Sequence, residues 1–415
     1  MGSDSDFAVV GTGIAPLVAA NRLASEGKSV IVINPDWDFF REDSELPFDP
    51  FWPPSKKTLN TKRVAKSLRK RALAELRPDF PGAIELWAST AEGDLKAGYH
   101  DFRAPHVRTR PRLWLHAPDL LDDKEPWEAI EELYVSAEDA ELKPSLITGF
   151  SALNSFPGAS KKTKRDENFR AVVVPKLCDV DVNRYRYGLL EYIRERLGEE
   201  RLITAASPLE LIPGGLKFFS RGAPRTVRIS EGLLVFWTPA LTQWVMGQSK
   251  KAEVPVPRPV SVQLWEQWSF LSRETLEPDC VGMFGDMAVW AEVEGSPTEP
   301  DKDLHRLSVL RAAPSLSFST FSQSPAFVLN SVYANSWASS ESFKSLAVLF
   351  HNLLRWDKFS VRAAKPRSIF NWANDQSCGF ELPNSSYKIW VDCGSDGPLV
   401  DVVSSARRAC ETVSS

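Results

Sequence analysis

The sequence has few of the residues from which metal centres and disulfide frameworks are built. Of its 415 residues only five are cysteines and five are histidines. No two cysteines form a C-x-x-C pair, and no two histidines have the four-residue spacing of a helical metal site. We therefore expect no metal centre, and reduced, mostly buried thiols at Cys178, Cys280, Cys378, Cys393 and Cys410.

Long apolar runs are also missing. No segment approaches the roughly 18 uninterrupted apolar residues of a membrane span. The first residues, MGSDSDF, are acidic where a secretory signal would be basic and then apolar. These features predict a cytoplasmic protein without an integral membrane segment.

The chain has no excess of positive charge. Lys and Arg number 50 against 54 Asp and Glu, which gives a formal net charge of -4 and argues against a dedicated nucleic-acid binder. The hydrophobic content of 43% excludes a disordered chain and suffices for two or three lobes.

The strongest local pattern that is present lies at the N-terminus. Residues 7–10 are apolar and predict a buried strand, Gly11-Thr12-Gly13 predicts a tight turn, and residues 14–26 have helical spacing. The apolar run 30–33 predicts a second strand, covered on both faces as in a parallel sheet. Together these form a β-α-β unit, the usual opening of a dinucleotide-binding domain.

The glycine turn indicates a pyrophosphate site. Gly11 permits the tight turn, Gly13 lets the backbone approach a phosphate, and the helix beginning at Ile14 directs N–H groups and its positive dipole end there. Two residues depart from the usual pattern: Pro16 occupies the third glycine position, and Asn34 stands where an acidic residue would bind the ribose hydroxyls.

Further elements are predicted along the chain. A helix is expected at 182–197, ending at Gly198, and a hairpin turn at Gly214-Gly215. A second, strand-rich region is expected over 246–340, followed by a helix at 341–356. Short strands are expected at 171–174, 201–203, 209–212, 216–219, 226–229 and 233–236, and a last strand and helix at 388–391 and 399–412.

Two distant segments resemble a known family. Residues 233–239, LLVFWTP, resemble the run ending in "ATP" that closes the FAD domain of flavin-dependent amine oxidases, which include protoporphyrinogen oxidase and phytoene desaturase relatives. The order of helix, strand and hairpin is shared with the D-amino-acid-oxidase and flavin monooxygenase branches. The resemblance implies an FAD cofactor, with the backbone near Leu209 contacting the adenine.

The C-terminal strand, turn and helix resemble the third flavin-contacting segment of these families. The resemblance places the flavin side of the cofactor at Gly394, Ser395, Asp396 and Gly397. Asp392 is an equal candidate for the role of Asp396. The arginine and paired glycines that normally follow the second strand in amine oxidases are absent.

The expected fold class is α/β, with a Rossmann-like FAD-binding lobe that is discontinuous in sequence and a second, mixed-sheet substrate lobe. Residues 1–45, 170–245 and 362–415 are expected in the first lobe. Residues 46–169 and 246–361 are expected in the second. The parallel-strand signatures at both chain ends must then meet in one sheet.

The expected function is that of an FAD-dependent oxidoreductase, an oxidase or a monooxygenase, acting on a small or aromatic organic substrate or on a residue of a partner protein. No catalytic residues can be assigned from the sequence. The alternative is a non-catalytic binding or assembly protein on a degenerate flavoprotein fold. The basic segment 56–71 is interpreted as a solvated surface helix, with a docking face for an acidic partner protein as the alternative.

Overall fold

The structure is a computed structural model, and its description is confined to part of the chain. The described residues are 2–35, 45–46, 107–116, 131, 134–135, 138, 143–159, 169–180, 182–237, 241–253, 259–272, 279–285, 287–294, 304–312, 316–317, 346–347, 349–354, 359–372, 379–384, 386–393 and 397–415. The basic segment 56–71 lies outside them. No helix among these residues is long and apolar enough to cross a membrane.

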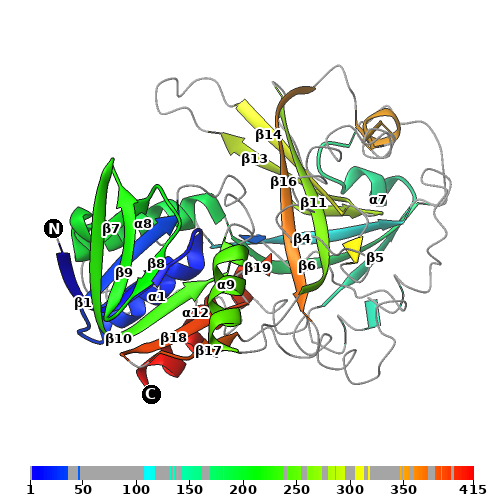
Figure 1. Ribbon diagram of the computed structural model, residues 1–415. Coiled ribbons are helices and arrows are strands. Elements are labelled where there is room, and N and C mark those ends of the chain that lie inside the picture. Colours follow the sequence, from blue (N-terminus) through cyan, green and yellow to red (C-terminus); the bar gives the residue numbers. More distant parts are fainter. Residues whose placement is uncertain are drawn as a thin grey trace.

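The chain forms two lobes that lie side by side, with both termini in the first (Figure 1). The first lobe is built on a sheet that has eight strands among the described residues. Along the sheet their order is β17 (Phe380–Leu382), β18 (Lys388–Asp392), β10 (Ala223–Phe236), β1 (Gly2–Val10), β2 (Val30–Pro35) and β7 (Leu202–Ala205), with β8 (Glu210–Ile212) and β9 (Gly215–Ser220) joined to β10.

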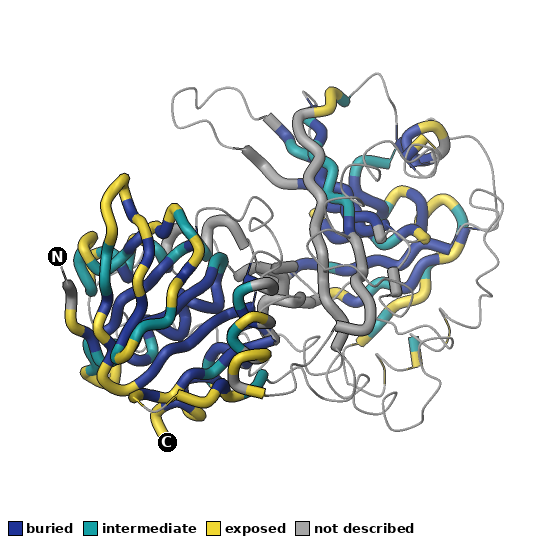
Figure 2. Tube along the Cα trace, in the orientation of Figure 1, coloured by how far each residue is buried: buried dark blue, intermediate teal, exposed yellow. Residues whose placement is uncertain are grey.

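The central strands of this sheet are parallel and buried on both faces. β1 lies between β10 and β2, and β18 pairs with the other edge of β10. In β1, Phe7 and Val9 point to one core cluster while Ala8 and Val10 point to the other. The continuous apolar runs in the sequence arise from this two-sided burial, which Figure 2 shows along the strands.

Helices cover one face of the first sheet. The cluster on that face combines residues of α1 (Ile14–Ser25), α8 (Val182–Leu197) and α12 (Leu399–Ser414) with those of the strands. The opposite face is covered by the β8–β9 hairpin and by α9 (Thr242–Ala252). The predicted helices at 14–26, 182–197 and 399–412 are thereby confirmed within one or two residues.

β10 differs from the prediction, which placed two separate strands at 226–229 and 233–236. It is one strand of 14 residues. Its first half pairs antiparallel with β9, while most of its length runs parallel to β1, from Thr226 beside Gly2 to Val235 beside Val10. The polar start of β1 gave no apolar signal, so neither the extension of β1 nor its partner could be recognised from hydrophobicity.

The second lobe is built on a sheet of nine strands among the described residues. Their order is β15 (Leu316–Ser317), β11 (Pro259–Ser272), β14 (Leu304–Ala312), β13 (Met287–Glu294), β12 (Val281–Phe284), β4 (Val107–His116), β6 (Arg170–Val180) and β5 (Ser145–Thr148), with β16 (Phe359–Trp372) paired to β11. One face packs against α7 (Phe150–Asn154) and the short π-helix η4 (Leu349–Leu353). This π-helix lies within the segment where a helix was predicted at 341–356.

Two segments differ from the expected division of the chain. Strand β6 begins at residue 170, which was assigned to the first lobe, but it pairs with β4 and β5 in the second sheet. Most of β16 was likewise assigned to the first lobe, yet it pairs with β11. An apolar run such as Ala171–Val174 signals burial on both faces, which both sheets provide, and does not identify the sheet.

Strand β4 was missed because its sequence, VRTRPRLWLH, is basic and contains a proline. Pro111 lies where the register between β4 and β6 shifts. A proline is tolerated in a sheet at such an irregularity, because its missing N–H breaks no regular ladder bond there.

Candidate functional site

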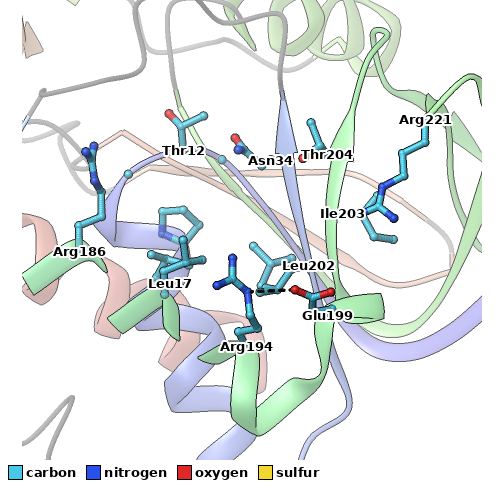
Figure 3. Close-up of a pocket in the computed structure, with 15 residues that line it drawn as sticks. Thr12, Leu17, Asn34, Arg186, Arg194, Glu199, Leu202, Ile203, Thr204 and Arg221 are labelled. Atoms are coloured by element: carbon cyan, nitrogen blue, oxygen red, sulfur yellow. Dashed lines mark ion pairs between the residues drawn. The ribbon is translucent and has the colours of Figure 1, made fainter. Parts of the chain in front are cut away.

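A cavity of about 380 Å³ lies in the first lobe, at the carboxyl ends of β1 and β2 (Figure 3). This is the edge at which open α/β sheets bind ligands. Its lining comes from two regions of the chain that are far apart in sequence, residues 11–34 and 186–221. The lining residues are Gly11, Thr12, Gly13, Pro16, Leu17, Val32, Asn34, Arg186, Leu190, Arg194, Glu199, Leu202, Ile203, Thr204 and Arg221.

The two glycines of the turn are required by its geometry. Gly11 has a φ of +155°, and a Cβ placed on it would lie 2.9 Å from the Cβ of Phe236. Its N–H donates to the carbonyl of Ile33 at 3.1 Å, which ties the turn to the end of β2. Gly13 has a φ of +81° and a ψ of -153°, a combination that essentially only glycine adopts. The tight turn predicted from these residues is present.

Helix α1 begins directly after this turn. Its N-cap is Gly13, which offers no side-chain hydrogen bond, and its first turn contains no acidic residue. The positive end of the helix dipole therefore faces the cavity without a carboxylate of its own first turn. Pro16 lines the cavity and lacks an N–H, so it removes one donor from the first turn but does not break a helix at this position.

Asn34 lies at the end of β2 and lines the cavity beside the glycine turn. It pairs across the strands with Thr204 of β7, which also lines the cavity. The lining thus runs from the end of β1 over the end of β2 to β7. The structure brings Gly11, Gly13 and Asn34 together as the sequence predicted.

Arginines contribute most of the charge around the cavity. Arg186, Leu190 and Arg194 of α8 all face it, at a spacing of four residues that puts them on one side of the helix. Arg194 pairs with Glu191 and, at 3.5 Å, with Glu199, which is the only carboxylate among the described lining residues. Glu199 is 79% exposed, so solvent screens much of that pair.

Arg221 reaches the cavity from the opposite side, from the turn between β9 and β10 (Figure 3). None of these arginines was identified from the sequence. The four-residue spacing on α8 could have suggested two of them. Arg221 carried no sequence signal, because it is brought to the cavity only by the folding of the hairpin.

The other predicted cofactor residues have different outcomes. Leu209 is 4% exposed and packs with Leu216 and Phe218 in the core, and it is not among the lining residues. Residues Leu202 to Thr204 of β7 line that side instead. Gly394, Ser395 and Asp396 lie outside the described residues. Gly397 belongs to the short strand β19 (Gly397–Pro398), which pairs with β3 (Glu45–Leu46).

Asp392, the alternative to Asp396, has a structural role. Its side chain is buried and accepts a hydrogen bond from the Ser405 hydroxyl at 2.7 Å. Its backbone carbonyl accepts from the N–H of Trp237 at 2.9 Å. These contacts fix α12 and the end of β10 to the end of β18.

Two of the described thiols, Cys280 and Cys410, are not activated nucleophiles. Burial raises the pKa of Cys280 and of Cys410 to about 12. The Cys280 thiol donates to the carbonyl of Ser155 at 3.3 Å, and that of Cys410 to the carbonyl of Ala19 at 3.6 Å. Within the described part of the chain no three His, Cys, Asp or Glu side chains gather as they would around a metal ion.

No protein-family model matches the sequence, and a comparison with curated proteins gives no match. Solved structures are similar in fold. An open form of NikD, described as an unusual amino acid oxidase essential for nikkomycin biosynthesis, has a TM-score of 0.60 at 11% identity, covering 99% of this chain and 94% of its own. Glycine oxidase from Bacillus cereus gives 0.58 at 10% identity, covering 99% and 97%.

L-amino acid deaminase from Proteus myxofaciens gives a TM-score of 0.57 at 12% identity, covering all of this chain and 91% of its own. These likenesses extend over both lobes. They confirm the predicted fold class, an α/β architecture with a mixed-sheet second lobe.

Proposed function

We propose that this protein is an FAD-dependent oxidoreductase. The observation that supports this most directly is the cavity beside the glycine turn, at the start of α1 and the carboxyl ends of two parallel strands. A turn that admits no Cβ at Gly11, followed by a helix without an acidic first turn, suits the pyrophosphate of a dinucleotide.

The residues of the site fit the adenosine diphosphate half of FAD. Gly11 and Gly13 would hold the pyrophosphate, Asn34 the ribose hydroxyls, and Leu202 to Thr204 the adenine. The neutral Asn34 weakens the ribose contact by about 1 kcal/mol relative to a carboxylate. The arginines of α8 offset this, since they attract the phosphates. The flavin side of FAD would lie toward residues 394–397.

When bound, FAD supplies the redox chemistry, and the protein supplies binding, orientation and exclusion of water. We propose a small amine or amino acid as the substrate, because the similar structures include amino acid oxidases and a deaminase. In this assignment the second lobe holds the substrate.

We propose that such a substrate binds at one face of the second sheet. The buried cluster on this face, opposite α7 and η4, contains Trp265 and Trp290 together with Val281, and none of its described members comes from a helix. Arg112 pairs in register with Val281 on β12, and the alternation of side chains places it on the same face. A guanidinium beside planar rings can hold a carboxylate and an apolar side chain together.

The cofactor assignment is tested by the visible spectrum of the purified protein. We expect flavin absorbance that is bleached when an amino acid substrate is added without oxygen. Gly13→Ala should strongly reduce the flavin content, because the new Cβ intrudes on the pyrophosphate site. Gly27→Ala is the matched control, since Gly27 has the same φ of +81° and lies outside the cavity lining.

A colourless protein that fails to bind added FAD in calorimetry would contradict this function. That result would favour the alternative, a non-catalytic binding protein with a flavoprotein fold. A yellow protein in which both glycine variants keep full flavin content would place the cofactor at a different site.

A further inference from the structure

Arg221 occupies a conformation that arginine rarely adopts. Ser220 of β9 pairs with Ala223 of β10, so Arg221 and Gly222 form a two-residue hairpin turn. Their φ angles are +50° and +77°, as in a type I′ turn. The first position of such a turn favours Asn, Asp or Gly, whereas a long side chain there is conformationally unfavourable. The turn itself therefore does not account for an arginine at this position.

The side chain of Arg221 is directed back to the cavity. It runs from the turn toward Ile203, and both residues line the cavity (Figure 3). Within the described part of the chain, no carboxylate forms an ion pair with Arg221, in contrast to Arg194 and its partner Glu199. Arg221 thus places a planar cation, without an ionic partner among the described residues, at the border of the cavity beside β7.

The order of the strands indicates which part of a nucleotide meets Arg221. The glycine turn follows β1, Asn34 ends β2, and Ile203 and Thr204 lie on β7, the next strand along the sheet. A nucleotide with its phosphates at the turn and its ribose at Asn34 therefore has its base at β7. The base then lies between the apolar Ile203 and the guanidinium of Arg221.

We propose that Arg221 stacks on the adenine of the bound nucleotide and holds the ring against Ile203. Guanidinium groups stack on planar π-systems, and this contact needs no hydrogen bond to the base. The proposal rests on the proposed function only in assigning an adenosine nucleotide to this cavity. It makes Arg221 a determinant of adenosine affinity that is contributed by the hairpin and not by the β-α-β unit.

The test is the affinity of the flavin-free full-length protein for ADP, measured by calorimetry. Arg221→Gly should weaken ADP binding about three- to thirtyfold, the range expected for loss of a cation–π contact. Affinity for inorganic pyrophosphate should stay unchanged. Glycine suits the left-handed turn, so this variant should be at least as stable as the parent.

The matched control is Lys143→Gly. Lys143 is another non-glycine residue with a positive φ, +53°, and it lies outside the cavity lining. The control should relieve the same backbone strain without changing the affinity for ADP. Equal ADP affinity in the parent and in Arg221→Gly would overturn the proposal.

Arg221→Lys separates stacking from charge. Because lysine keeps the charge but not the planar group, this variant should bind ADP more weakly than the parent protein does. Full affinity in Arg221→Lys would overturn the stacking role. A second result would also overturn it. If the parent protein binds 2′-phospho-AMP more tightly than AMP and Arg221→Gly loses this preference, Arg221 binds a ribose phosphate and does not stack on the base.

The two proposals can fail separately. If ADP binding depends on Arg221 but the protein never takes up FAD, the proposed function fails and the role of Arg221 stands. If the protein binds FAD and Arg221→Gly binds ADP normally, only the role of Arg221 fails.

Discussion

Single residues determine whether the cavity can form. A Cβ added to Gly11 would lie 2.9 Å from the Cβ of Phe236, so a larger residue is sterically excluded there. A Cβ added to Gly27 would have no atom within 4 Å. Both glycines have positive φ, so the two positions separate crowding from backbone strain. Position 11 is sensitive because the end of β10 passes directly behind the turn.

Gly11→Ala should lower the free energy of unfolding by about 1–3 kcal/mol more than Gly27→Ala does, because only the first adds a steric overlap to the strain. It should also weaken ADP binding, since the turn must shift. Urea denaturation of both variants and calorimetry with ADP measure these effects. Equal destabilisation by the two substitutions would contradict the crowding argument.

Two buried thiols and one buried phenol predict how the stability of the protein changes at high pH. Burial raises the pKa of Cys280, Cys410 and Tyr387 to about 12 each, from ordinary values of 9 to 10. Between these values the folded protein keeps protons that the unfolded chain has released. The contribution of these three groups to the free energy of unfolding is therefore fully present below about pH 9 and decreases as the pH rises toward 12.

Thiol alkylation provides the measurement. At pH 8 Cys280 and Cys410 should react with iodoacetamide only after denaturation, because they are 3% and 1% exposed and remain protonated. Mass spectrometry of the labelled peptides identifies each site. The midpoint of urea unfolding should also decrease steadily from pH 9 to pH 11. Rapid labelling of the folded protein at either site would be inconsistent with their placement.

Among the elements, the C-terminal helix α12 depends on small side chains. Ala406 and Ala409 are fully buried and belong to the same core cluster as Ala15 and Ala19 of α1. Small residues allow the two helices to approach closely, and the Cys410 thiol contacts the carbonyl of Ala19 at 3.6 Å. Helix α12, at the C-terminal end of the chain, thus packs against α1, at the N-terminal end, in the core of the first lobe.

Ala409→Asp should destabilise the protein by about 3 kcal/mol or more, because it buries an unpaired charge between the helices. Arg408→Asp is the control, since Arg408 is exposed one residue earlier and should tolerate the change within about 0.5 kcal/mol. Thermal unfolding followed by circular dichroism compares the two. Similar losses in both variants would place the helix in a different rotation.

The bond between Ser405 and Asp392 fixes α12 to β18. Ser405→Ala removes a hydrogen bond to a buried carboxylate and should cost about 1–3 kcal/mol. The double variant with Asp392→Ala should lose less than the sum of the two single variants, because both remove the same interaction. Additive losses in a double-mutant cycle would show that the two side chains do not interact.

In the whole molecule, each lobe has its own hydrophobic core, and the two lobes are built from interleaved parts of the chain. The cavity belongs entirely to the first lobe, whereas Phe156, Phe270, Phe284 and Phe350 pack together in the second. The chain passes from the first lobe into the second to form β4 and β6, returns to the first lobe, and passes into the second lobe again to form β11 to β16. Binding of the adenosine half of a nucleotide should therefore depend on the first core alone.

Phe284→Ala should destabilise the second core by about 3–5 kcal/mol, because Phe284 is fully buried. The folded variant should bind ADP with the affinity of the parent protein. Calorimetry below the unfolding transition measures this directly. A parallel loss of ADP affinity would show that the two cores are coupled.

Local sequence patterns were sufficient to identify the features that depend on neighbouring residues. The β-α-β unit, the glycine turn, helix α8 up to Gly198 and the final strand and helix could all be recognised, because apolar periodicity and turn glycines act over a few residues. The two-sided burial of β1, β2 and the end of β10 was likewise visible as continuous apolar runs. Gly11, Gly13 and Asn34 followed from this local pattern.

Pairing between distant strands was decided only by the tertiary structure. Strand β6 lies in the second sheet, β10 is one continuous strand, and the basic segment 107–116 forms strand β4. In each case the backbone hydrogen bonds are made to strands far along the chain. The cavity lining depends on the same long-range pairing. Arg221 lies beside Ile203 because β9 and β10 form a hairpin that turns back over the sheet, and no local pattern encodes that meeting.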